Sequence, residues 1–252
     1  MKIRLPFDKE AWKFAGIFAV AALFLGFFST NMGWVGFLLT VACLMFFRDP
    51  DRVQPSSQTA VVSPADGIVL KISEAILPTE LGINERMKKV SIFMSVLNVH
   101  VNRSPIKGVV EKIVYIPGKF FNVTLDKSSE ENERQITCLR LESGLRLIFV
   151  QIAGLIARRI RCDIQEGQEL ATGERVGMIR FGSRVDLYIP LEFPIMVEEG
   201  QVMVAGETVI TDLKFAKKED KKPATPKKEE RTEEPKKSEE NLENPTNTEE
   251  QK

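Results

Sequence analysis

Three residues in the sequence have side chains that could carry chemistry: His100, Asp66 and Ser183. His100 is the single histidine of the chain, and histidine is the usual proton carrier near neutral pH. Valines on both sides of it predict a strand in which His100 faces away from them, and Asn98 and Asn102 alternate with it to line a polar face. The same pattern also fits a hydrogen-bonded structural histidine, so both interpretations stay open at this level.

Asp66 and Ser183 each lie in a sequence typical of a turn. Asp66 belongs to Ser63-Pro-Ala-Asp-Gly67, and Asp-Gly is a strong turn former, so a structural role competes with a chemical one. Ser183 follows Gly182 directly before an expected strand. A hydrolase nucleophile would occupy G-x-S-x-G at a strand–helix elbow, and neither a second glycine nor a helical pattern follows here. The local sequence therefore argues against a serine hydrolase.

The segment that must position these residues is predicted to be an all-β domain. Short β-branched runs alternate with Gly, Pro, Ser and Asn, which is typical of strands and turns. The expected strands are 60–62, 68–72, 89–93, 108–114, 137–141 and 145–152. Only 78–86 and 155–161 are expected to hold short helices.

Two sequence patterns that each occur twice, here called the internal echoes, favour a particular β architecture. The pattern S-P-x-x-G-x-V occurs at 63–69 and again at 104–110, and an E-G-Q…G-E-x-V pattern occurs at 166–176 and at 199–209. Each glycine suits a tight turn, and each valine suits a strand. Such paired turn-and-strand units resemble the biotinyl/lipoyl-type barrel-sandwich hybrid. We therefore expect a mainly β, barrel-sandwich-hybrid-like domain.

An apolar block without charges runs from residue 14 to 47, interrupted by polar residues at 29–31. A membrane-spanning helix needs about 20 apolar residues. The block predicts a hydrophobic helical hairpin, with one long helix or a non-spanning interfacial hairpin as alternatives. Basic residues flank it on both sides, which favours both ends in the cytoplasm. It is too long for the apolar core of a signal peptide and has no clear A-x-A cleavage site.

Composition divides the chain into three expected parts: a membrane-anchoring hairpin at 1–52, a β-rich domain at 53–215, and a disordered charged tail at 216–252. The tail has too few apolar residues to offset the entropy of ordering. The 35 basic residues equal the 35 acidic ones, so the overall charge indicates no nucleic-acid partner. Three scattered cysteines without C-x-x-C argue against a disulfide framework or a zinc site and fit a reducing compartment.

Together these signals identify a family. The segments 93–105, 120–134 and 181–186 resemble phosphatidylserine decarboxylase in its short, archaeal-type form, and the resemblance extends over about residues 10–212. It implies a lyase made as a zymogen. Ser183 would attack the Gly182 carbonyl, the chain would be cut between these two residues, and the former serine would end as a covalent pyruvoyl group.

The resemblance also implies the reaction. A decarboxylation leaves a carbanion, and carbonyl cofactors accept its electrons through a Schiff base. The pyruvoyl group would thus convert phosphatidylserine into phosphatidylethanolamine and CO₂, with no metal and no diffusible cofactor. The implied partners are the membrane phospholipid and the two cleavage fragments, which form a heterodimer, while a higher oligomer stays open. The implied location is the cytoplasmic face of the cell membrane.

The resemblance assigns roles residue by residue. His100 aligns with the histidine that donates a proton in turnover, and Asp66 aligns with the aspartate of self-cleavage. Longer bacterial relatives carry a second histidine three positions after the first, where this chain has Arg103. The Asp-His-Ser relay is therefore incomplete here. Arg103 is expected to hold charge near Asp66 and to contribute to substrate binding.

Two other function classes fit the sequence less well than the decarboxylase does. A non-enzymatic lipoyl-like membrane adaptor would need a long helical hairpin with heptads, and the sequence has none. A pyruvoyl decarboxylase acting on a soluble amino acid would leave the apolar N-terminal block without a purpose.

Overall fold

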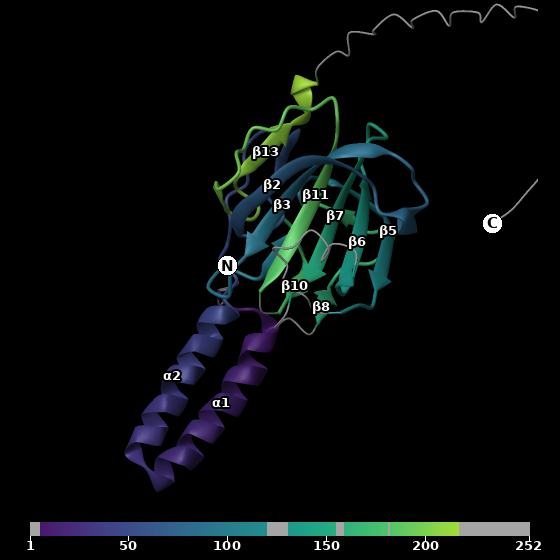
Figure 1. Cartoon of the computed structure of the whole chain (residues 1–252). Coiled ribbons are helices and arrows are strands. Elements are labelled where there is room, and N and C mark those ends of the chain that lie inside the picture. The colour runs from purple at the N-terminus through teal and green to yellow at the C-terminus, as the bar shows by residue number, and fades with distance from the viewer. Residues whose placement is uncertain (1–5, 120–130, 155–158, 181, 217–252) are drawn as a thin grey trace, which may run out of the picture. The chain divides into compact units, whose positions relative to one another are not determined.

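The computed structural model describes residues 6–119, 131–154, 159–180 and 182–216, and it combines an N-terminal helical hairpin with a β domain (Figure 1). The predicted tail lies outside the described residues except for Ala216. The hairpin consists of α1 (Lys9–Phe28) and α2 (Thr30–Phe46), so the expected break near residue 29 is confirmed. Ser29 ends α1 and donates its backbone N–H to the Leu25 carbonyl at 3.1 Å.

Small residues allow the two helices to pack closely. A side-chain carbon added at Gly36 would lie 2.5 Å from the Ala22 methyl group, so only glycine permits this approach. Large apolar residues face outward instead, such as Leu23 at 78% and Phe27 at 87% exposure. α1 is long and apolar enough to cross a membrane, whereas α2, with 17 residues, is shorter. The hairpin therefore presents an apolar surface that the protein itself does not cover.

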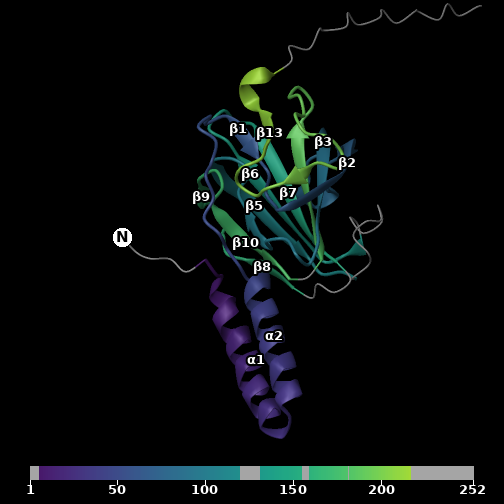
Figure 2. The same ribbon diagram turned by 90° about the vertical axis from the view of Figure 1, so that its left-hand side faces the viewer.

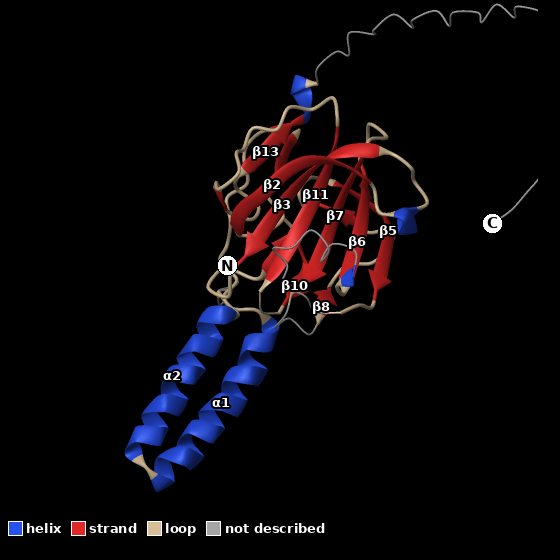
Figure 3. Ribbon diagram, viewed as in Figure 1, coloured by secondary structure: helices blue, strands red, loops and turns tan. Residues whose placement is uncertain are grey.

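The β domain is built mainly on a curled sheet (Figure 3). Within the described residues its strand order is β12-β2-β3-β11-β7-β6-β5-β9, and smaller sheets have the orders β4-β10-β8 and β1-β13. The strands are β1 (Ala60–Val62), β2 (Gly67–Ile76), β3 (Arg86–Met94), β4 (Val101–Arg103), β5 (Gly108–Ile116), β6 (Arg134–Arg140), β7 (Arg146–Ala153), β8 (Ile160–Cys162), β9 (Glu169–Leu170), β10 (Arg175–Ile179), β11 (Ser183–Pro190), β12 (Val202–Met203) and β13 (Val209–Asp212). This confirms the mainly β class and each of the six expected strands.

Of the two short helices expected in the β domain, the described end of one is a strand, and the other is shorter than expected. Residues 160 and 161 are in β8, which pairs with β10, while 155–158 lie outside the described residues. The stretch 78–86 holds only a single 3₁₀ turn, Thr79–Leu81. There the chain must reverse quickly, because Arg86 already pairs with Ile76 in the β2–β3 hairpin. Strand pairing thus overrides local helix preference at 160–161 and limits the helix in 78–86 to one turn.

The internal echoes form equivalent hydrogen bonds. The hydroxyl groups of Ser63 and Ser104 each donate to the carbonyl two residues further on, at 2.6 and 2.8 Å. The backbone carbonyl of Ser63 accepts from the Gly206 N–H, and that of Ser104 accepts from the Gly173 N–H. Each S-P-x-x-G turn is therefore held by one of the later glycine turns, as a duplicated unit requires.

The two duplicated units also bind each other. The Val62 N–H donates to the Pro105 carbonyl at 2.8 Å, and the Arg103 N–H donates to the Pro64 carbonyl at 2.9 Å. This reciprocal pairing joins strands that are far apart in sequence and supports the expected resemblance to a barrel-sandwich hybrid.

The hairpin is fastened to the β domain by apolar packing and by ion pairs. Phe46 and Phe47 of the hairpin end form a buried cluster with Val99, Val101 and Met178. Figure 2 shows the hairpin extending from the end of the domain where β8 and β10 lie.

The ion pairs reach from the start of α1 to the β8–β10 region. Arg161 holds Asp8 through two bonds of 2.6 and 2.7 Å, and Arg180 holds Glu10 through two bonds of 3.1 and 2.6 Å. Because Arg180 lies two residues before Gly182, these contacts connect the hairpin to the region of the predicted cleavage.

Candidate active site

Ser183 begins β11, at the point where the chain passes from one sheet to another. β10 ends at Ile179 in the small sheet, and β11 then enters the centre of the large sheet between β3 and β7. Gly182, just before Ser183, has φ of 54°, a left-handed conformation that glycine adopts without steric cost. The predicted cleavage bond therefore joins a residue in a tight turn to one locked in a sheet.

The Ser183 side chain is fully buried. Its hydroxyl donates to the sulfur of Met94 at 3.3 Å, and Met94 is its register partner on β3. A thioether is a weak acceptor, so little free energy opposes removal of this hydrogen bond. The side-chain nitrogen of Asn102 donates to the same sulfur at 3.6 Å, and the side-chain nitrogen of Gln151 donates to Oδ1 of Asn102 at 2.8 Å. Ser183 thus lies at the end of a buried series of hydrogen-bonded side chains.

His100 is also fully buried and precedes β4. Its Nδ1 lies 2.9 Å from the Asn98 carbonyl oxygen, which can only accept, so Nδ1 must be the protonated nitrogen. Nε2 therefore carries the lone pair, and no hydrogen-bond partner reaches it among the described residues. The ring lies against Phe46, with centroids 4.2 Å apart.

This environment favours the neutral imidazole. Burial lowers the pKa of His100 to about 4, and the nearby positive charge of Arg48 acts in the same direction, while the hydrogen bond to Asn98 opposes both. At neutral pH, Nε2 is therefore a buried proton acceptor. It can donate only after it has taken up a proton during the reaction.

Asp66 lies immediately before β2, and its carboxylate is held in place. Arg52 donates to Oδ2 at 2.8 Å, and the Ala205 backbone N–H donates to Oδ1 at 2.8 Å. The following residue, Gly67, passes so close to the Phe93 carbonyl that a side-chain carbon there would lie 2.0 Å from its oxygen.

Arg103 is buried and lies at the junction with the hairpin. Its guanidinium donates to Asp49 at 3.0 Å, to the Pro50 carbonyl at 2.9 Å and to the Gly173 carbonyl at 3.0 Å. Arg103 therefore holds the segment that follows α2, and the charge of Asp66 acts on it as well. Its predicted contribution to substrate binding stays untested.

The strand register places Asp66 and Ser183 at the same end of the large sheet. Ile68 pairs with Phe93 between β2 and β3, and Met94 pairs with Ser183 between β3 and β11. Asp66 and Ser183 thus lie about two strand spacings apart, roughly 10 Å. Within the described part of the chain, no hydrogen bond joins Ser183 to Asp66 or to His100.

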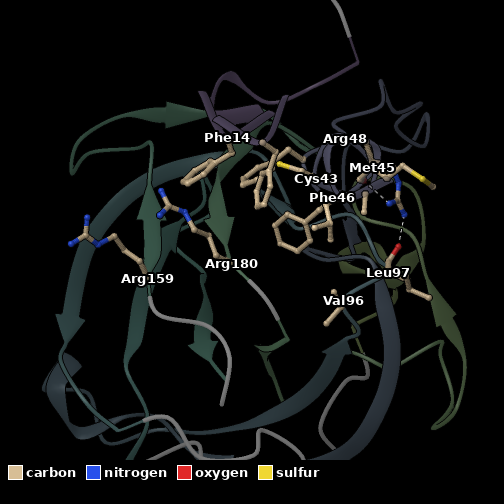
Figure 4. Close-up of a pocket in the computed structure, with 13 residues that line it drawn as sticks. Phe14, Cys43, Met45, Phe46, Arg48, Val96, Leu97, Arg159 and Arg180 are labelled. Carbon is tan, nitrogen blue, oxygen red and sulfur yellow. Dashed lines mark hydrogen bonds between the residues drawn. The ribbon is translucent and has the colours of Figure 1, made fainter. Parts of the chain in front are cut away.

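A pocket of about 880 Å³ opens beside His100, between the hairpin and the β domain (Figure 4). Its lining is mostly apolar but includes three arginines: Phe14, Phe18, Leu39, Ala42, Cys43, Met45, Phe46, Phe47, Arg48, Val96, Leu97, Arg159 and Arg180. Phe46 is a wall of this pocket and also covers the His100 ring. Phe46 therefore separates the pocket from the His100 ring, and the dimensions of the pocket suit an amphiphilic ligand.

Sequence reasoning missed several members of this site. Met94 and Gln151 read as ordinary strand residues, and Phe46 read only as part of the apolar block. Asn102 was singled out by its alternation with His100, and it does face the buried interior. Asn98 differs, because it lies in a turn and its carboxamide oxygen accepts from the Ser95 backbone and hydroxyl.

Among the described residues, no group of three or more His, Cys, Asp or Glu side chains comes together as a metal site. Cys43, Cys138 and Cys162 are free thiols.

The model of the phosphatidylserine decarboxylase family matches residues 39–211. The phosphatidylserine decarboxylase proenzyme of Cereibacter sphaeroides is 53% identical over 209 residues, which cover 82% of this chain and 90% of that protein. Proteins of the same name from Rickettsia akari and Ruegeria pomeroyi are each 50% identical, over 81% and 83% of this chain and 89% and 96% of their own lengths. This chain belongs to the phosphatidylserine decarboxylase family.

Proposed function

We propose that this protein decarboxylates phosphatidylserine to phosphatidylethanolamine and CO₂ with a pyruvoyl group that it makes from Ser183. The observation that carries the proposal is the placement of Ser183. Its hydroxyl is buried and weakly bound, directly after a glycine in a left-handed turn, in a chain whose relatives are named proenzymes.

Self-cleavage begins at the bond between Gly182 and Ser183. The Ser183 oxygen attacks the Gly182 carbonyl carbon, the peptide C–N bond breaks, and the hydroxyl proton passes to the released amine, which leaves an ester. Loss of the Ser183 Cα proton then expels the Gly182 carboxylate and leaves a dehydroalanine. One water enters and one ammonia leaves to give the terminal ketone. Burial of Ser183 protects the ester from premature hydrolysis.

Asp66 assists this step in our proposal. It lies at the same end of the sheet as Ser183, and its carboxylate is fixed by Arg52 and by the Ala205 N–H. The separation of about two strand spacings leaves room for a bridging water. Arg103 keeps the nearby charge balanced, because it lies within electrostatic reach of Asp66.

The residues around Ser183 fit a carbonyl cofactor. A ketone at this position acts as an electron sink for the carbanion formed when CO₂ leaves. Nε2 of His100 is a buried lone pair without a partner among the described residues, so it can accept the proton that the substrate ammonium must lose. His100 then returns a proton to the carbon from which CO₂ has departed. One residue thus acts first as base and then as acid.

The two fragments are expected to stay together after cleavage. β11 lies in the C-terminal fragment, yet it is paired on one side with β3 and on the other with β7, both from the N-terminal fragment. β12 and β13 pair with β2 and β1 in the same way. We therefore propose a heterodimer of fragments 1–182 and 183–252 as the working enzyme.

The location in our proposal is the cytoplasmic face of the cell membrane. The exposed apolar surface of the hairpin would lie in the bilayer, and the basic residues at both ends favour cytoplasmic flanks. A pocket at the base of the hairpin then meets its lipid substrate at the membrane surface.

The proposal is tested by the mass and activity of the purified full-length protein. Intact-mass measurement should show fragments 1–182 and 183–252, and the smaller should resist N-terminal sequencing because its amine has been replaced by a ketone. The same preparation should release CO₂ from phosphatidylserine in mixed micelles. Activity from a single uncut chain would disprove the pyruvoyl mechanism.

Membrane attachment and turnover should be separable within the hairpin. Replacing Phe24, Phe27 and Phe28 with serine removes exposed apolar surface at the end away from the site, so retention in washed membranes should fall while self-cleavage continues. Deleting 1–47 should reduce both retention and turnover, because it also removes Phe46 from His100. Full activity of the deletion variant on micellar substrate would contradict this second part.

A further inference from the structure

The pocket at the base of the hairpin contains positive charge that its surroundings only partly neutralise. Arg180 is neutralised, because Glu10 accepts two hydrogen bonds from it. Arg48 donates to the Met45 carbonyl at 2.8 Å and to the Leu97 carbonyl at 2.6 Å. Carbonyl oxygens are uncharged, so these bonds orient the Arg48 guanidinium without cancelling its charge.

Arg159 adds a second uncompensated charge. It is exposed, and within the described residues its guanidinium forms no ion pair or side-chain hydrogen bond. Figure 4 shows Arg159 and Arg180 on one side of the pocket and Arg48 on the other, with Phe14 and Phe46 between them. Two cations therefore lie at opposite margins of a mostly apolar space. Such an arrangement fits an anion that carries an apolar part.

The apolar part of the pocket is continuous with the hairpin. Phe14 and Phe18 of α1 and Leu39 of α2 line it, and the outer surface of both helices is apolar as far as the turn. An acyl chain can therefore pass from the pocket along the helices without crossing a polar barrier.

We propose that Arg159 binds the phosphodiester group of a diacyl lipid, that Arg48 adds positive potential from the other side of the pocket, and that the acyl chains lie against Phe14, Phe18 and Leu39. This inference rests on the proposed function and specifies how that site holds its substrate. Guanidinium groups pair well with phosphate oxygens, and no side chain of the described residues occupies the donors of Arg159.

The chemistry of decarboxylation favours the phosphate over the serine carboxylate as the partner of these arginines. The carboxylate loses its charge as it becomes CO₂. A cation bound to it would stabilise the substrate more than the transition state and would slow the reaction. The phosphodiester keeps its charge throughout, so binding it lowers the free energy of both states and only anchors the lipid.

The test measures lipid binding separately from turnover. The processed full-length protein in nonionic detergent is titrated calorimetrically with dihexanoyl phosphatidylglycerol, a phosphodiester without amine or carboxylate. Arg159→Gln should weaken this binding about tenfold, the scale of a lost charge-assisted hydrogen bond, and Arg159→Lys should restore part of it. The matched control is Arg140→Gln, which changes an exposed arginine at the end of β6 remote from Ser183 and should bind like the unchanged protein.

Two further ligands distinguish a lipid phosphate from other sources of affinity. Dihexanoyl glycerol, which has no phosphate, should bind equally to Arg159→Gln and to the unchanged protein, and inorganic phosphate should bind far more weakly than the lipid. In decarboxylation assays, Arg159→Gln should raise KM about tenfold with kcat within about twofold.

Unchanged binding of phosphatidylglycerol by Arg159→Gln would overturn the inference, as would inorganic phosphate binding as tightly as the lipid. A protein that binds the lipid as described but releases no CO₂ would refute the proposed function and leave this binding site standing.

Discussion

Replacing Ser183 with alanine should leave one uncut chain of full mass and abolish decarboxylation to the detection limit. The substitution removes the only atom that can attack the Gly182 carbonyl in our mechanism, and without cleavage no ketone forms. Because the partner of the lost hydroxyl among the described residues is a methionine sulfur, the fold should lose little stability. A denaturing gel and a CO₂-release assay on the same preparation measure both effects.

A buried serine in the neighbouring strand serves as the control. Ser91 lies in β3, opposite Asp186 of β11, and is almost fully buried. Ser91→Ala should be cut and should retain activity. Circular dichroism of Ser183→Ala should match that of the unchanged protein, so that a folding defect is not mistaken for a chemical one. A cut, active Ser183→Ala protein would end the pyruvoyl proposal.

The second large effect is expected from the separate roles of His100 in turnover and Asp66 in self-cleavage. His100→Ala should still cut itself but should decarboxylate about 10²–10⁴-fold more slowly, the usual range for loss of a general acid–base group. Asp66→Ala should remain largely uncut, because its carboxylate is positioned at the Ser183 end of the sheet. Both variants are followed by gel and by CO₂ release.

A conservative substitution serves as the control for the Asp66 variant. Asp66→Asn keeps the size of the side chain and can still accept from either Arg52 or Ala205, yet it loses the charge, so it too should stay largely uncut. If His100→Ala remains a single chain, His100 is needed for maturation and the proposed division is wrong.

The pH dependence provides a second readout for His100. Burial keeps the pKa of His100 near 4 in the folded protein, so the base form should persist, and kcat/KM should begin to fall only as the pH approaches 4. Phe46→Ala would expose the ring to water and should move this acid limb toward the ordinary value of about 6.5. An acid limb near 6.5 in the unchanged protein would argue against a buried neutral histidine as the base.

The lowered pKa of His100 also predicts how the free energy of unfolding depends on pH. The unfolded chain binds a proton to His100 at a higher pH than the folded chain does, so the free energy of unfolding should decrease as the pH falls from about 6.5 toward 4. Above about 6.5 both states are neutral at this residue, and the contribution is fully present.

The sequence by itself determined those features that depend on local pattern. A charge-free apolar run interrupted at 29–31 predicts a helical hairpin, and the hairpin turns at Ser29. β-branched runs between turn formers predict six strands that all exist, and the S-P-x-x-G echoes predict the duplicated turns. Neighbouring residues along the chain suffice for these features, because side-chain periodicity and turn chemistry act within a few residues.

Only the tertiary structure decided what surrounds each candidate residue. Nothing near residue 100 in the sequence predicts that Phe46 lies on the His100 ring, or that Met94 accepts a hydrogen bond from the Ser183 hydroxyl. Arg103 was expected near the substrate, yet its guanidinium is bound by Asp49 and by backbone carbonyls. The last two residues of the helix expected at 155–161 are in a strand for the same physical reason. Pairing between distant segments satisfies backbone groups and buries side chains, and this outweighs local preference.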